Sequence, residues 1–314
     1  MGNSGAVLLV LATLVGCARS NASAPAQRDA AGSTTAQPTP RSGPAEPKAD
    51  AAAVSASRVL RFAWRPPGGS AAEYETLDVA DGHRVVLPPG TTRGRAYPVV
   101  IALHGQPKRE QAPRHYRFTE VVTRVAQSLW TRGDSAQFVL ALPAFRFTGA
   151  NWPAFDLVLF KKELERELAA EGVQASRYYV VGHSAAAGCG GLGMNGAHRL
   201  EPAAVGFFDT CVGAGFRSEV RALRKAGIPT LLAYSVETAG FRPRPPREYM
   251  TSFDFGKVFA PLGLAPSDCP ARLPDAPLRP QPFRCASDSS GVVRAFVLDT
   301  GEGEAGHNAV VPVA

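Results

Sequence analysis

Short apolar runs recur along the chain from residue 58 onward, and amphipathic segments separate several of them. Eight runs have the length and composition of β-strands: RVLRFAW, HRVVLPPG, YPVVIALHG, QFVLALPAF, RYYVVGHS, AAVGFFDTC, IPTLLAYSVE and VVRAFVLDT. Several of these runs are apolar throughout, which is typical of strands that are buried on both faces. The pattern therefore predicts a central sheet that is covered on both sides.

Amphipathic helices are predicted where apolar residues recur at three- and four-residue spacing. The segments are FTEVVTRVAQSLWTRG, FDLVLFKKELERELAAEG and SEVRALRKAG. We expect the second helix to end at Gly172, and the third to begin at an N-cap, Ser218, and to stop at Gly227. Strands that alternate with helices predict an α/β fold, with a mostly parallel central sheet flanked by helices. No helix separates the first two strands, so we expect an antiparallel start.

The N-terminal residues differ in character from the rest of the chain. An apolar run over 6–15 is too short to span a bilayer, and it indicates a signal peptide over 1–16. The run ends in L-V-G-C, which resembles a bacterial lipobox and implies cleavage before Cys17 and lipidation of that residue. An ordinary cleaved signal peptide with a chance cysteine is the alternative. The resemblance implies a lipid-anchored protein of the bacterial cell envelope that faces outside the cytoplasm. We expect it in the outer membrane or the periplasm, and the sequence leaves open the choice between inner and outer membrane.

Residues 17–57 are rich in Ala, Ser, Thr and Pro. Such a composition cannot bury a core, so we expect a disordered tether between the lipidated cysteine and a single domain at 58–314. The formal net charge is +7, but Lys and Arg are scattered singly rather than gathered in a basic run. We therefore expect no nucleic-acid partner.

Five cysteines are present, and Cys17 belongs to the lipobox. The other four, Cys189, Cys211, Cys269 and Cys285, are an even number in an exported domain and predict two disulfides. Three pairings are possible. A bond between Cys269 and Cys285 would close a short Pro-rich loop that we expect to lack other order, leaving Cys189 with Cys211. No CxxC spacing occurs, so we expect no metal site.

Polar residues follow several of the predicted strands at their carboxyl ends, which is where open α/β sheets place their sites. They are His104-Gly105-Gln106, Gly182-His183-Ser184, Asp209, Glu237 and, after the last strand and a Gly/Glu loop, His307.

The segment Gly182–Ala186, GHSAA, resembles the nucleophile elbow G-x-S-x-G of the α/β-hydrolase fold, with Ala186 in place of the last glycine. The resemblance covers roughly residues 58 to 314 and implies a serine hydrolase with Ser184 as nucleophile. Small neighbours are needed because the elbow turns sharply against adjacent strands. The glycine-rich segment that follows predicts a helix that either packs unusually closely on the sheet or is short and distorted.

A serine hydroxyl needs a base to take its proton and a third group to orient that base. The family order of serine, acid and histidine implies that His307 is the base. Glu237 stands at the family's commonest acid position, and Asp209 is the alternative. The resemblance also implies an oxyanion hole from the amides of Ala185 and Gln106.

Three further residues are expected to shape the loops of this site: His104, Gly105 and Gly182. The leading functional hypothesis is cleavage of a small-molecule carboxylic ester through an acyl-enzyme, without a cofactor. Two alternatives stay open: an amidase or peptidase of the same fold, which uses the same chemistry, and a non-catalytic envelope lipoprotein that only binds its ligand.

Overall fold

The protein is described from a computed structural model, which covers residues 57–62, 83–105, 117–132, 137–143, 155–187, 193–235, 259–269 and 282–298. The predicted signal peptide, Cys17 and the predicted tether up to residue 56 lie outside these ranges. Within the described ranges, no helix is long and apolar enough to cross a membrane.

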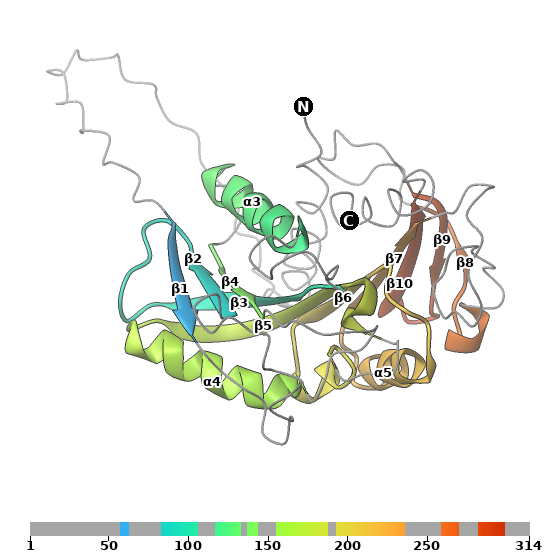
Figure 1. The fold of residues 1–314 in the computed structure, drawn as a ribbon. Coiled ribbons are helices and arrows are strands. Elements are labelled where there is room, and N and C mark those ends of the chain that lie inside the picture. Colours follow the sequence, from blue (N-terminus) through green and yellow to red (C-terminus); the bar gives the residue numbers. More distant parts are fainter. Residues whose placement is uncertain are drawn as a thin grey trace, which may run out of the picture.

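The described strands form one ten-stranded sheet in the order β1-β2-β4-β3-β5-β6-β7-β10-β9-β8 (Figure 1). Their bounds are β1 Arg58–Phe62, β2 His83–Leu87, β3 Ala96–Leu103, β4 Val139–Leu142, β5 Gln174–His183, β6 Ala204–Phe208, β7 Thr230–Ser235, β8 Ala265–Ser267, β9 Pro282–Ser287 and β10 Val293–Leu298. Neighbours from β4 to β10 pair in parallel, whereas β1, β2, β8 and β9 pair antiparallel. The predicted antiparallel start is confirmed.

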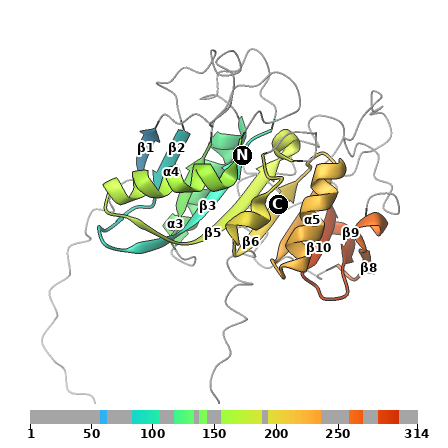
Figure 2. The ribbon, with the colours of Figure 1, turned by 90° about the horizontal axis from the view of Figure 1, so that it is seen from below.

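Helices cover both faces of the sheet. Helix α3 (Arg117–Arg132) lies on one face, and α4 (Leu157–Ala170) and α5 (Ala214–Lys225) lie together on the other (Figures 1 and 2). Successive residues of β3 serve the two faces in turn: Val99 and Ile101 pack in the cluster that includes α4 and α5, and Val100 and Ala102 pack in the α3 cluster. This arrangement confirms the predicted α/β-hydrolase fold class.

Local sequence features determine where helix α4 begins and ends. Asp156 caps its first turn by accepting hydrogen bonds from Val158 N at 2.7 Å and Leu159 N at 3.2 Å. Gly172 follows its last turn at φ 72°, a conformation that glycine adopts without steric cost.

Helix α5 begins earlier than expected, at Ala214 with Gly213 as N-cap, so the prediction of an N-cap at Ser218 is wrong. The buried side chain of Phe216 extends the apolar stripe of Val220 and Leu223 toward the N-terminus. Burial of that stripe outweighs the capping preference of a single serine. The helix stops as predicted before Gly227, which has φ 70°.

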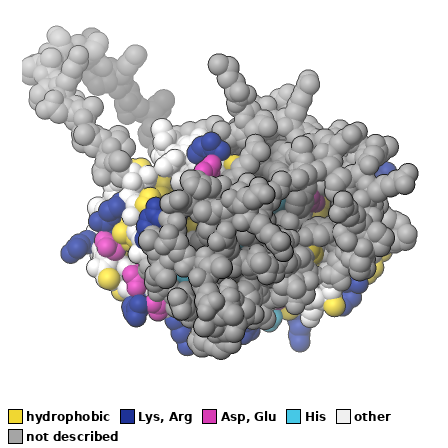
Figure 3. Space-filling view, in the orientation of Figure 1, with side chains coloured by type: hydrophobic (Ala, Val, Ile, Leu, Met, Phe, Trp, Pro, Cys, Tyr) yellow, Lys and Arg dark blue, Asp and Glu magenta, His cyan; other side chains and the backbone are white. Residues whose placement is uncertain are grey.

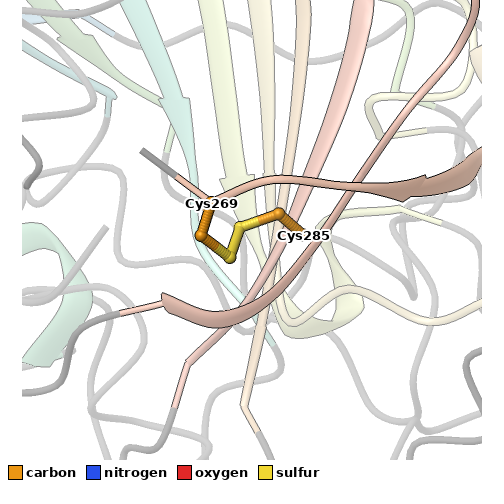
Figure 4. The surroundings of a disulfide bond; sticks show 2 residues. All are labelled: Cys269 and Cys285. Atoms are coloured by element: carbon orange, nitrogen blue, oxygen red, sulfur yellow. A yellow bond between two sulfur atoms is a disulfide. The ribbon is translucent and has the colours of Figure 1, made fainter. Parts of the chain in front are cut away.

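The Cys269–Cys285 disulfide is confirmed, and Cys285 lies within β9 (Figure 4). The expectation that this loop lacks other order is wrong at its ends, because β8 precedes Cys269 and pairs with β9 through Ser267 and Cys285. Cys211 is also disulfide-bonded, and Cys189 lies outside the described residues.

Charged side chains of both signs are interspersed on the surface over β1 and α4 (Figure 3). Arg58 pairs with Glu171 at 2.6 Å, and Arg199 pairs with Asp156 at 3.0 Å. Exposed pairs of this kind contribute about 0 to 1 kcal/mol each.

Candidate active site

Ser184 leaves the sheet directly after β5 with a left-handed backbone. Its φ is 54°, and it is one of three non-glycine residues with positive φ in the described part of the chain, with Glu201 and Asp209. Such a conformation costs on the order of 1–3 kcal/mol, and it persists only where the surrounding structure enforces it. The sharp turn at Ser184 is therefore the geometry that the elbow motif predicted.

Gly182 and Ala186, two residues before and after Ser184, pack closely against each other, and the Met194 side chain packs against Gly182. A Cβ added at Gly182 would lie 2.2 Å from Met194 Sδ and 2.7 Å from Ala186 Cβ. Both distances are well inside van der Waals contact, so only glycine fits at this position. Gly182 is thus required by close packing behind the elbow.

The chain continues from Ser184 as a single 3₁₀ turn, Ser184–Ala186, and Ala187 is already extended at φ −147°. Residues 184–187 thus agree with the short and distorted alternative, and residues 188–192 of the glycine-rich segment lie outside the described residues. The amide of Ala185 stands in the first turn, where N–H groups have no partner within the helix itself. This position suits the predicted oxyanion role, which stays a prediction.

Asp209 occupies the position on β6 that corresponds to Ser184 on β5. The strands pair in parallel, with His183 opposite Phe208, so both residues follow directly after one registered pair. Asp209 has φ 46° and is 6% exposed. Its carboxylate accepts hydrogen bonds from Ser235 N at 3.1 Å and from Ser235 Oγ at 2.7 Å. The end of β7 therefore holds this carboxylate in place.

A second contact joins the same two strand ends. The hydroxyl groups of Thr210 and Tyr234 lie 3.0 Å apart. Burial raises the pKa of the Tyr234 phenol above its usual value, so the group stays protonated at neutral pH. The polar groups at the ends of β6 and β7 thus form a buried network beside Asp209.

The His104-Gly105 segment leaves β3 next to the elbow, because Leu103 is in register with Gly182. Burial lowers the pKa of His104 from 6.5 to about 4, so the imidazole is neutral at neutral pH. His104 Nδ1 lies 2.6 Å from the carbonyl oxygen of Gly105, and it donates because a carbonyl oxygen only accepts. This local bond fits the predicted loop-shaping role of both residues.

Glu219 was not among the predicted site residues. It lies on α5, is 4% exposed, and accepts hydrogen bonds from Gly196 N at 2.6 Å and His198 N at 2.7 Å. Its carboxylate also contacts His198 Nδ1 at 2.9 Å. The signal in the sequence was a carboxylate within the apolar stripe of a helix, between Phe216 and Val220.

The structure brings together Gly182, Ser184, Ala185, Asp209 and the His104-Gly105 segment at one edge of the sheet. Three predicted residues, Gln106, Glu237 and His307, lie outside the described residues. Within the described ranges, no group of three or more His, Cys, Asp or Glu side chains is arranged to hold a metal ion.

No family model matches the chain, and no curated protein matches its sequence. Solved structures that it resembles include a thermostable esterase, an acetyl xylan esterase from Aspergillus awamori and a feruloyl esterase module from Clostridium thermocellum. The first is 15% identical with a TM-score of 0.42; the match covers 73% of this chain and 54% of that protein, so the chain spans about half of its length.

The acetyl xylan esterase is 11% identical, with a TM-score of 0.45 and coverage of 80% of this chain and 96% of the other. The feruloyl esterase module is 13% identical, with a TM-score of 0.44 and coverage of 82% and 88%.

Proposed function

We propose that this protein is a serine hydrolase that cleaves a carboxylic ester through an acyl-enzyme. The observation that carries the proposal is the left-handed backbone of Ser184 at the carboxyl end of a central parallel strand, with Gly182 two residues before it and Ala185 and Ala186 directly after it. A strained serine directly after a strand is the backbone geometry of a nucleophile elbow. In this structure the Ser184 side chain is buried, with 7% exposure of the residue. The buried carboxylate of Asp209 beside it supplies a further part of a catalytic triad.

In the proposed reaction, Ser184 Oγ attacks the ester carbonyl carbon while His307 accepts the hydroxyl proton. The amides of Ala185 and Gln106 donate to the oxygen that becomes negative, which is worth several kcal/mol of barrier. His307 then gives the proton to the departing alcohol. Water repeats the sequence on the acyl-enzyme, releases the acid and restores Ser184.

Two carboxylates compete for the task of orienting His307. Glu237 follows β7, at the family's commonest acid position, whereas Asp209 directly follows β6. Three observations support Asp209: its position in register beside Ser184, its positive φ, and the two hydrogen bonds from Ser235. Those two bonds fix the orientation of the carboxylate, and a fixed carboxylate is what holds the base of a triad in the correct orientation.

The proposal is tested by labelling the full-length protein with a fluorophosphonate probe, beside its Ser184→Ala variant. We expect labelling of the wild type and none of the variant, because the probe reports an activated serine. A folded wild-type protein that takes no label contradicts the proposal, and it favours the alternative of a protein that binds without catalysis.

Turnover of an ester substrate, measured beside the labelling, separates the two candidate acids. Loss of the carboxylate that orients the histidine typically lowers turnover by about 10⁴-fold. We expect this loss in Asp209→Asn and little change in Glu237→Gln; the reverse result would assign the acid to Glu237. Matched ester and amide substrates then decide between an esterase and an amidase or peptidase.

We further propose that the protein is anchored in the bacterial cell envelope by lipid on Cys17 and faces outside the cytoplasm. The support is the L-V-G-C sequence after an apolar run. Two or more acyl chains anchor a protein stably to a membrane. A Cys17→Ala variant should move from the detergent-rich to the aqueous phase on Triton X-114 partition; equal partition of both proteins contradicts the anchor.

A further inference from the structure

We propose that Glu219 is a positioning residue for the nucleophile Ser184, which it controls through Met194. The inference rests on the proposed function, because it concerns the reactivity of Ser184. It adds a residue from another helix, 35 positions beyond the motif, since 219 − 184 = 35.

Glu219 holds a short segment of chain by three contacts. The carboxylate accepts from the backbone N–H groups of Gly196 and His198, and it lies within hydrogen-bond distance of His198 Nδ1. Gly196 has φ 121°, which favours glycine, and the 3₁₀ turn Ala197–Leu200 begins immediately after it. Glu219 therefore fixes the start of this turn from the side of α5.

Met194 lies two residues before Gly196 and is fully buried. Its N–H donates to the carbonyl oxygen of Ala186 at 2.8 Å, and its own carbonyl accepts from Ala197 N at 3.0 Å. Met194 thus bonds at once to the elbow and to the turn that Glu219 holds. Its sulfur also occupies the space beside Gly182 where a Cβ would stand.

These contacts clamp the elbow on both sides of Ser184. Gly182 precedes the serine by two residues and Ala186 follows it by two, and Met194 contacts both. A strained residue keeps its conformation only while its surroundings enforce it. We infer that the carboxylate of Glu219 is one origin of that constraint, because it fixes the segment that carries Met194.

A carboxylate suits this task better than an amide of the same shape. Glu219 receives three donors with two acceptor oxygens, whereas a glutamine would offer one acceptor oxygen and turn an NH₂ group toward other N–H donors. A buried N–H that loses its acceptor is costly, so the turn would relax to find other partners. A shift of about 1 Å in the elbow is enough to slow a reaction by about 100-fold.

The test compares Glu219→Gln with the wild type in the full-length protein. We expect the rate of fluorophosphonate labelling and the kcat for an ester substrate to fall by about 10- to 100-fold, with KM changed by less than about threefold. Glu165→Gln on α4 is the control for the loss of an accepting carboxylate at a more exposed position, because Glu165 accepts bonds from two side chains, Lys161 at 2.8 Å and the Tyr178 hydroxyl at 2.9 Å. We expect its labelling rate to stay within twofold of the wild type.

Action through Met194 is tested by a double-mutant cycle. Met194→Ala removes the side-chain contact with Gly182 but keeps the N–H bond to Ala186, so it should slow labelling, and Met194→Leu should largely restore the rate. Glu219→Gln should slow labelling less in the Met194→Ala background than in the wild type. Independent, multiplying effects of the two substitutions would overturn the inference. If Glu219→Gln does not fold, His198→Ala removes only the Nδ1 contact, and we expect an intermediate slowing of labelling.

The outcomes also separate this inference from the proposed function. A wild type that labels, together with a folded Glu219→Gln variant that labels equally fast, overturns the role of Glu219 and leaves the hydrolase proposal standing. A wild type that does not label overturns the hydrolase proposal, and the inference about Glu219 falls with it.

Discussion

The residues with positive φ differ between the two edges of the parallel sheet, that is, between the amino ends and the carboxyl ends of its strands. Before the strands, positive φ angles occur at glycines that lie two or three residues ahead of β3, β5, β7 and β10: Gly94, Gly172, Gly227 and Gly291. After the strands, they occur at Ser184 and Asp209, each directly behind a strand end. At the amino ends of the strands the exception is Glu201, an exposed non-glycine residue with positive φ that precedes β6.

This difference shows what each end has to provide. A chain reversal before a strand makes no demand on a side chain, so glycine, which adopts positive φ at no steric cost, is sufficient. At the other end, the side chain itself has to stand on the turn, and the fold accepts the strain of placing it there. Left-handed non-glycine residues at strand ends therefore mark the side of this sheet where chemistry is expected.

The largest effect on the labelling of Ser184 is expected from Gly182→Ala, which lies at the carboxyl end of β5. The added Cβ would meet Met194 Sδ and Ala186 Cβ in a fully packed place, and overpacking of this kind costs about 1–3 kcal/mol. Because the clash pushes directly on the elbow, we expect labelling of Ser184 to fall by more than about 100-fold even where the protein is folded. Urea unfolding and the labelling rate at low urea measure the two effects separately. Labelling at the wild-type rate would show that the elbow does not depend on this packing.

The second effect is a loss of stability at acid pH that originates at His104. Its folded pKa of about 4 lies below the ordinary 6.5, so the unfolded chain takes up a proton first as the pH falls. Stability is therefore complete above pH 6.5 and declines between pH 6.5 and about 4, by up to about 3 kcal/mol.

A His104→Gln variant cannot take up this proton and serves as the comparison. The urea midpoint of the variant should vary less with pH than that of the wild type. The difference between the two proteins should arise only between pH 6.5 and about 4. Parallel curves for the two proteins would contradict the assignment of this dependence to His104.

The smallest effects are expected at the other end of the strands. Gly172→Ala puts a Cβ on a residue at φ 72°, which costs about 1–2 kcal/mol, and Glu201→Gly relieves a residue at φ 49° and should gain up to about 1 kcal/mol. Neither change should alter the labelling rate of Ser184 at temperatures where the proteins are folded. A clear change in that rate would break the distinction between the two ends. Thermal unfolding and labelling are the measurements.

The sequence predicted the parts of the fold that depend on local pattern. The central strands were found because they are continuous apolar runs, and Ser184 was found because its neighbours are small for a reason that the motif records. Strands β8 and β9 were missed, because APS and PFRCAS have no alternation of their own and form a sheet only by pairing with β10 and across the disulfide.

The site was predicted less completely than the fold, because its supporting contacts join distant segments. The contact of Met194 with Gly182 and the hold of Glu219 on Gly196 depend on how α5 packs against the turn, which no local pattern encodes. Asp209 was recognised as a candidate from its place after a strand. Its bonds to Ser235 became visible only when β6 and β7 were paired.

The outermost strand β8 has a consequence for how this protein behaves at high concentration. A sheet edge with free backbone groups invites strands of other molecules, and is the usual start of aggregation. Among the described strands, β8 ends the sheet with three exposed residues, and one of them, Pro266, has no N–H to donate. The opposite edge, β1, carries two charged side chains, Arg58 and Arg61, and charged residues are typical of edge strands that do not pair with other molecules. These features of β8 and β1 disfavour the addition of a strand from another molecule, so we expect the folded protein to resist assembly into fibrils at high concentration.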